Sequence, residues 1–274
     1  MSARGAGGWL KTYAVVYLAF LYGPVLLLPI FAFNDSTIIS FPLKGFTTKW
    51  FEQLVNNPVL QGAVGNSLYV AISAASISTI LGIFAARASA RFDFPAKRGI
   101  MGFIMLPLVL PEIIIAVALL VILIQLGLDL SLSTVILGHV LVCTPFSIAI
   151  LSSAFQNLDR SLEEASLDLG ETRLGTFFRV TLPLVAPGVI SSLLISFTIS
   201  LDEFIIAFFL TGTEPTLPVY IWSQLRFTAK LPSVMALGFL LLVLSLVLLL
   251  AAEYFRRRAI TRTGAQGAAT GGLM

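Results

Sequence analysis

The hydrophobic pattern along the chain consists of long, unbroken apolar stretches. A helix needs about 20 mostly apolar residues to cross a bilayer, and six stretches are long enough: residues 12–33, 64–86, 100–126, 132–154, 185–211 and 233–254. The first follows two basic residues, but it is too long for a signal-peptide core and no convincing cleavage site follows it. The pattern predicts an all-α integral membrane protein with six transmembrane helices.

Composition agrees with this fold class. Hydrophobic residues make up 57% of the 274 positions and charged residues only 11%, whereas soluble domains carry about 25% charged residues. The net charge of +3 comes without a long basic run, so nucleic acid is not expected as a partner. The single cysteine, Cys143, excludes an intrachain disulfide and is interpreted as a small apolar packing residue.

The distribution of lysine and arginine predicts the topology, because cytoplasmic loops carry an excess of both. Of the 17 basic residues, 13 lie in the N-terminal segment, in the loops that follow the second and fourth stretches, and in the C-terminal tail. The other side holds four: Lys44, Lys49, Arg226 and Lys230. We therefore expect a cytoplasmic N-terminus over residues 1–11, a membrane domain over 12–255, and a disordered cytoplasmic tail over 256–274 that is Gly-rich.

The loop over residues 157–188 has the pattern of two short helices. Ser161 and Glu164 have the spacing of a capping box, which starts a helix, and Gly170 can end it. Thr172 can cap a second helix, which Pro183 is expected to break before the fifth apolar stretch.

One face of the first short helix is apolar. Leu162, Ala165 and Leu169 have the spacing of residues on one helix face. An apolar face on a helix outside the bilayer needs a surface to dock against, either the lipid headgroup layer or a partner protein.

The same loop resembles a known family pattern. Glu164, Ala165 and Ser166 are followed after three residues by Gly170, and nine residues later come Val180, Thr181, Leu182 and Pro183. This resembles the E-A-A-x3-G-x9-I-x-L-P loop of binding-protein-dependent ABC importer permeases, with Ser166 and Val180 as conservative departures. The alternative, that Glu164 only caps its helix and Gly170 only ends it, stays open.

The resemblance covers about residues 10–255 and is closest to the spermidine/putrescine-type permeases. Residues 45–72 resemble the short external helix and the following Asn66-Ser67 pair of that subgroup, and residues 106–120, 196–212 and 216–237 also resemble it. This implies the type I ABC importer permease architecture with six transmembrane helices, in a bacterial inner membrane.

The resemblance also implies roles and partners. The coupling loop, residues 156–183, would dock on a cytoplasmic ATPase dimer through Glu164, Ala165, Ser166, Gly170, Leu182 and Pro183. A second permease subunit, an extracytoplasmic substrate-binding protein and membrane lipid are the other expected partners. The chain has no Gly-x4-Gly-Lys-Ser/Thr motif. We therefore expect no catalytic residue, metal or cofactor in this chain, with ATP and Mg bound by the ATPase.

Acidic residues inside the apolar stretches are candidates for a substrate path. Asp202 and Glu203 are adjacent in the fifth stretch, and Glu112 follows two prolines in the third. Each acid near the bilayer centre costs about 2.5–3.5 kcal/mol, so a path for a di- or polycation such as spermidine or putrescine is one explanation. The alternative is an ion pair or interhelical hydrogen bonding that fixes the packing.

Two aromatic residues, Tyr220 and Trp222, could attract ammonium groups above such a path, or could belong to an interfacial aromatic belt. His139 is expected to make a packing hydrogen bond. A self-sufficient secondary transporter, with Asp202, Glu203 and Glu112 as proton or cation relays, is an alternative function. So is an importer permease for another small polar solute. The two-helix loop favours an ATP-driven importer over the secondary transporter.

Overall fold

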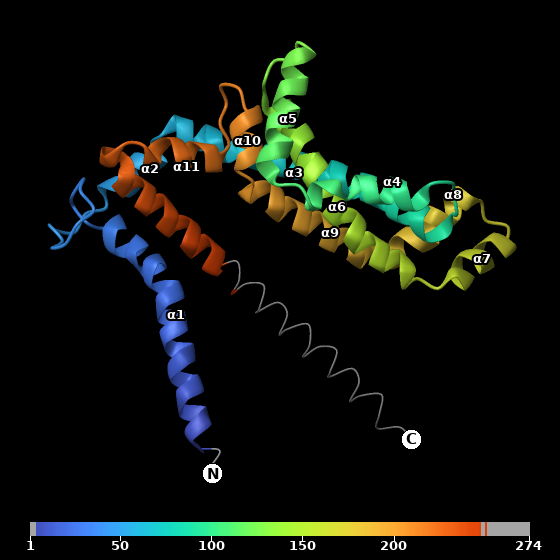
Figure 1. The fold of residues 1–274 in the computed structure, drawn as a ribbon, viewed down its shortest axis with the longest axis horizontal. Helices are drawn as coiled ribbons and strands as arrows, with labels where there is room; N and C mark the ends of the chain where they lie inside the picture. The colour runs from blue at the N-terminus through green and yellow to red at the C-terminus, as the bar shows by residue number, and fades with distance from the viewer. Residues whose placement is uncertain (1–3, 248–249, 251–274) are drawn as a thin grey trace. The chain divides into compact units, whose positions relative to one another are not determined.

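The computed structural model describes residues 4–247 and residue 250. Within these residues the chain is helical, and its only β pairing is an isolated bridge between Asn34 and Phe46. The chain divides into two compact units, one of residues 1–57 and 223–274 and the other of residues 58–222 (Figure 1). The predicted tail and the end of the sixth apolar stretch lie outside the described residues.

The first unit contains α1 (Arg4–Ala32), α2 (Lys49–Val55) and η3 (Thr228–Lys230), with an apolar helix over Thr228–Val247. Aromatic rings hold these elements together, since the Phe33 ring lies 4.9 Å from that of Phe51 and 5.4 Å from that of Phe239. The short helix expected before the second apolar stretch is α2, which confirms that element.

The second unit is built on three long helices, α3 (Pro58–Arg91), α6 (Leu132–Gln156) and α9 (Leu182–Asp202), which pack against one another. Small residues let them approach closely. A Cβ atom added at Gly82 would lie 2.7 Å from the Cβ of Ser147, and one at Gly188 would lie 2.6 Å from that of Ala154. Such small-residue contacts are typical of helices that pack in a membrane.

A ladder of buried serines on α9 faces the other two helices. Its members, one turn apart, and their partners are Ser192 with Thr79 (3.4 Å), Ser196 with Ser147 (2.9 Å) and Ser200 with His139 (2.7 Å). Interhelical hydrogen bonds of this kind hold helices together where little hydrophobic driving force acts between them. The packing hydrogen bond expected of His139 is confirmed.

The third predicted stretch is not one continuous helix. It splits into α4 (Lys97–Ile104), η1 (Leu106–Leu108) and α5 (Glu112–Gln125). Pro107 lies inside η1, and Pro111 has the extended conformation φ −57°, ψ 131° before α5. Proline lacks a backbone donor and its ring clashes with the preceding turn, so a continuous helix over 100–126 was the wrong prediction.

The fifth predicted stretch is also interrupted. The helix α9 ends at Asp202 and α10 begins at Ile205 and runs to Leu210. Five helices in the described residues are long and apolar enough to cross a membrane, and α5 is a shorter apolar helix. The five are Trp9–Ala32, Pro58–Arg91, Leu132–Gln156, Arg173–Asp202 and Thr228–Val247.

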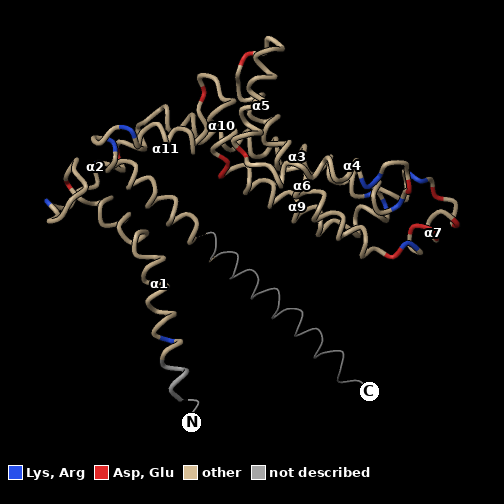
Figure 2. Tube along the Cα trace, viewed as in Figure 1, with Lys and Arg blue, Asp and Glu red and all other residues tan. Residues whose placement is uncertain are grey.

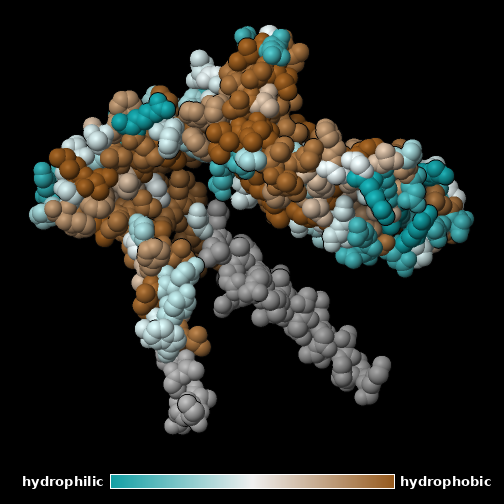
Figure 3. Space-filling view, in the orientation of Figure 1, coloured by the Kyte–Doolittle hydropathy of each residue, from teal (hydrophilic) through white to brown (hydrophobic). Residues whose placement is uncertain are grey.

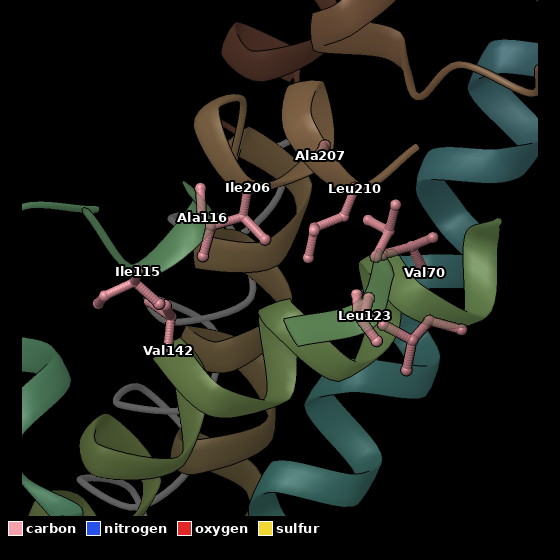
Figure 4. Packing of buried hydrophobic residues seen from close by; sticks show 10 residues of the cluster. Val70, Ile115, Ala116, Leu123, Val142, Ile206, Ala207 and Leu210 are labelled. Atoms are coloured by element: carbon pink, nitrogen blue, oxygen red, sulfur yellow. The ribbon is translucent and has the colours of Figure 1, made fainter. Parts of the chain in front are cut away.

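The helices α5 and α10 share one hydrophobic core with α3 and α6. Figure 4 shows Ile115 and Ala116 of α5 close to Ile206 of α10. Gly138 of α6 makes room for this packing, because a Cβ atom there would collide with Ile206 and would lie 2.8 Å from a methyl carbon of Leu210. The packing of α10 therefore depends on a glycine in the facing helix.

The helix α11 (Leu217–Leu225) begins directly after Thr216, at the end of the loop that follows α10, and Pro218 is its second residue. Two neighbouring residues of α3 fix its start. The Asn66 side-chain amide donates to the carbonyl of Pro215 (3.1 Å), and the Ser67 hydroxyl accepts from the backbone N–H of Leu217 (2.8 Å). The Asn66-Ser67 pair noted in the sequence thus anchors this loop to α3.

Candidate functional site

Charged residues gather at one end of the second unit, over α4, α7 (Arg160–Asp168) and α8 (Arg173–Thr176) (Figure 2). The same end is hydrophilic in Figure 3, whereas α5 is largely hydrophobic. Most of this charged end belongs to the coupling loop.

The first helix of the coupling loop begins differently from the prediction. Asp159 is its N-cap and accepts a hydrogen bond from the Ser161 N–H (2.9 Å). This bond lowers the pKa of the exposed Asp159 carboxyl. The predicted capping box of Ser161 and Glu164 is wrong, because the preceding acid already caps the helix and Ser161 lies within it. Glu164 instead pairs with Arg160 (3.2 Å) on the exposed surface.

The predicted stop at Gly170 is confirmed. Gly170 has φ +88°, a left-handed conformation that other residues adopt only with strain. Its N–H donates to the carbonyl of Leu167 (2.9 Å), and the N–H of Glu171 donates to that of Ser166 (3.2 Å). This pair of bonds is the Schellman motif, which satisfies the last carbonyls of a helix.

The second helix joins α9 without the predicted break. Thr172 caps α8 by accepting from the Gly175 N–H (3.0 Å), as expected. A π-helical turn over Phe177–Thr181 then leads directly into α9, where Pro183 occupies the first turn. The break expected at Pro183 was wrong, because the first turn of a helix tolerates a residue without an N–H donor and the wider π turn precedes it.

A buried glutamate, not the exposed one, fixes the loop to the helices. The Nε of Arg91, the last residue of α3, donates to Glu163 Oε2 (2.5 Å), and the Thr181 hydroxyl donates to Glu163 Oε1 (2.7 Å). Arg91 also donates to the carbonyl of Leu158 (3.1 Å). Sequence reasoning favoured Glu164 and missed Glu163. Adjacent helical residues point about 100° apart, so the two neighbouring glutamates can lie in different environments, and the packing of α7 decides which of them is buried.

The predicted apolar face of α7 lies on the surface. Leu162 is 45% exposed and Leu169 is 89% exposed, and Ala165 is exposed as well. Ser166 turns the other way, and its hydroxyl lies 3.0 Å from that of Thr176. Of the remaining predicted coupling residues, Leu182 is half-buried and Pro183 is exposed.

The two acids at the end of α9 occupy different environments. Glu203 is buried, and its carboxylate accepts hydrogen bonds from the N–H groups of Ile206 (3.0 Å) and Ala207 (3.1 Å). Its Oε2 also lies 3.3 Å from Nε2 of His139. Glu203 therefore caps α10 at the helix break, while Asp202, the last residue of α9, is exposed.

The other candidates for a substrate path lie on α5 and α11. Glu112 is exposed at the first position of α5, one turn before Ala116 of the shared core. The Trp222 ring lies 5.4 Å from that of Phe204, beside the helix break, and is 46% exposed, whereas Tyr220 is buried. Among the described residues, no group of three or more His, Cys, Asp or Glu side chains could hold a metal ion.

Comparison with known proteins adds to this geometry. Residues 78–261 match the family described as binding-protein-dependent transport system inner membrane component. The chain is 37% identical over 242 residues to the putrescine transport system permease protein PotI of Escherichia coli K12, covering 85% of each chain. It is 34% identical over 240 residues to the spermidine/putrescine transport system permease protein PotC of the same organism, covering 87% of this chain and 90% of PotC.

A solved structure has the same fold. A chain from a bacterial ABC transporter that imports the acidic polysaccharide alginate superposes with a TM-score of 0.73 at 14% identity, covering 93% of this chain and 98% of that chain. The fold class and the resemblance noted in the sequence are therefore confirmed, although a count of six spans is not. The chain belongs to the family of inner membrane permease components of binding-protein-dependent ABC transport systems.

Proposed function

We propose that this chain provides half of the translocation path of an ATP-driven polyamine importer and that its coupling loop docks on a cytoplasmic ATPase dimer. A second permease subunit would complete the path, and the ATPase would bind the ATP and Mg. The polyamine class is supported by the names of the two permeases, PotI and PotC, to which the chain is similar over most of its length.

The observation that carries the ATPase proposal is the construction of α7. The helix is capped at both ends, is fixed to the membrane helices from its buried side by Glu163, and presents Leu162 and Leu169 outward. A rigid helix with an exposed apolar face can transmit a movement from another protein to the membrane helices only if that protein binds the face. A groove on a separate protein would bind it.

Asp202 is the most suitable residue for a cation relay. It is exposed beside a helix break, whereas the neighbouring Glu203 carboxylate is occupied by two backbone N–H groups. Glu112, at the start of α5, and Trp222, beside Phe204, are further candidates for contact with an ammonium group. Glu203 and Tyr220 would then line or support the path rather than bind the solute at their polar atoms.

Uptake of labelled putrescine or spermidine, in cells that lack other polyamine importers, tests the substrate class. Asp202→Asn keeps the size of the side chain but removes its charge, so uptake should fall at least about tenfold, the effect of one charge-assisted contact. Glu214→Gln, an exposed acid in the loop after α10, is the matched control and should transport normally. Normal uptake by Asp202→Asn would refute the relay, and no polyamine uptake by the unaltered system would point to another small polar solute.

Co-purification tests the docking surface. Leu169→Asp places a charge on the highly exposed leucine that caps the C-terminal end of α7, so the ATPase should be lost from the purified complex while the permease still folds. Leu43→Asp is the control, because Leu43 is also exposed (46%) but lies far along the chain from the coupling loop. Full retention of the ATPase by Leu169→Asp would contradict docking on this face.

A further inference from the structure

We propose that a pocket between the end of α3 and the coupling loop binds the phosphate group of an anionic phospholipid. The pocket has a volume of about 210 Å³ and contains four arginines and two glutamates. These charged residues are Arg87, Arg91, Arg160, Arg173, Glu163 and Glu164.

The charges in this pocket do not balance. Arg91 is paired with Glu163 and Arg160 with Glu164. That leaves two arginines, Arg87 and Arg173, and neither has a carboxylate partner among the residues that the structure describes. The pocket therefore carries an excess of two positive charges.

Arg87 is the pocket residue that a bound anion would stabilise most. Its guanidinium carbon lies 4.4 Å from the centre of the Phe177 ring, and its Nε is buried without a hydrogen-bond acceptor in the described residues. A buried donor of a charged group without an acceptor is destabilising. A phosphate group offers several acceptor oxygens, and arginine binds such oxygens in a two-pronged geometry.

The position of the pocket favours a lipid as the source of this phosphate. The apolar stretch of α3 ends at residue 86, so Arg87 and Arg91 lie where a membrane helix leaves the hydrocarbon layer. Two exposed apolar residues, Phe92 and Leu167, also line the pocket. A pocket that combines arginines with exposed apolar residues at the end of a membrane helix matches a phospholipid better than a free phosphate ion.

Native mass spectrometry of the purified chain, together with any partners that it retains, tests the proposal. The protein is stripped of lipid in detergent and titrated with phosphatidylglycerol or phosphatidylcholine. The double variant Arg87→Gln, Arg173→Gln should bind phosphatidylglycerol at least about tenfold more weakly than the unaltered chain, since it loses charge-assisted hydrogen bonds. Arg98→Gln is the matched control, because Arg98 is an exposed arginine of α4 outside the pocket, and it should bind normally.

The possible results separate the proposal from its alternatives. Equal binding of phosphatidylglycerol by the double variant and the control, or no preference over phosphatidylcholine, would overturn the site. Inorganic phosphate that competes at the affinity of the lipid would overturn the lipid source. Loss of the ATPase with unchanged lipid binding would assign the pocket to an acidic side chain of the partner instead. Should the double variant misfold, Arg173→Gln alone, at an exposed position, must still weaken lipid binding.

Discussion

At the scale of single residues, neighbouring acids with similar sequence surroundings have different roles. Glu163 is buried with both carboxylate oxygens occupied, while Glu164 is exposed beside Arg160. Glu203 is buried against backbone N–H groups, while Asp202 is exposed. In both pairs one acid is enclosed by the fold and makes hydrogen bonds within it, while its neighbour lies on the surface.

The different roles of Glu163 and Glu164 predict different losses of thermal stability when each is replaced by glutamine. Glu163→Gln leaves the half-buried Arg91 without its counter-charge, and breaking a fully buried pair costs about 3–5 kcal/mol, so the denaturation temperature in detergent should fall clearly. Glu164→Gln breaks only a surface pair, worth about 0–1 kcal/mol, and should leave it nearly unchanged. If the two variants lost equal stability, the anchoring role of Glu163 would be disproved.

At the scale of elements, two membrane helices are interrupted and their pieces, α5 and α10, pack together. Prolines cause the first interruption, and at the second the Glu203 carboxylate satisfies the free N–H groups of the new helix start. Free backbone donors inside a membrane are costly unless satisfied. Both acids that we favour for the solute, Glu112 and Asp202, lie at these interruptions.

Because α6 and α10 lie very close together at Gly138, one methyl group added at this position should lower the stability of the protein. Gly138→Ala would push its Cβ into Ile206 and Leu210, and overpacking of this kind costs about 1–3 kcal/mol. Gly62→Ala in α3 has open space around the new Cβ and should stabilise the helix by about 0.5–1 kcal/mol. Thermal denaturation of both variants in detergent checks the prediction, which a harmless Gly138→Ala would contradict.

At the scale of the whole molecule, the charge distribution predicts the orientation in the membrane. Thirteen of the 17 basic residues lie on the side that we assign to the cytoplasm. In the orientation that we propose, the coupling loop would lie on that side, where it could dock on a cytoplasmic ATPase.

Thiol labelling of intact cells checks this orientation. Thr48→Cys should react with an impermeant reagent, whereas Ala265→Cys, in the tail outside the described residues, should not. The native Cys143 is buried and gives little background. Labelling at residue 265 without labelling at residue 48 would reverse the topology and rule out ATPase docking on α7.

The sequence by itself determined the membrane class, the helical fold, the approximate location of the apolar helices and the position of the two-helix coupling loop along the chain. These features depend on local composition and spacing: a bilayer selects apolar stretches of fixed length, and Gly170 and Thr172 act within one turn of their own helices. Tertiary structure decided which acid of each pair is buried, how α9 continues past Pro183 and which arginines lack a partner. The helix at Pro183 depends on the π turn that directly precedes it. The burial of the acids and the pairing of the arginines depend on residues far apart in sequence, such as Arg91 and Glu163, whose contact exists only once α3 and the coupling loop have packed together.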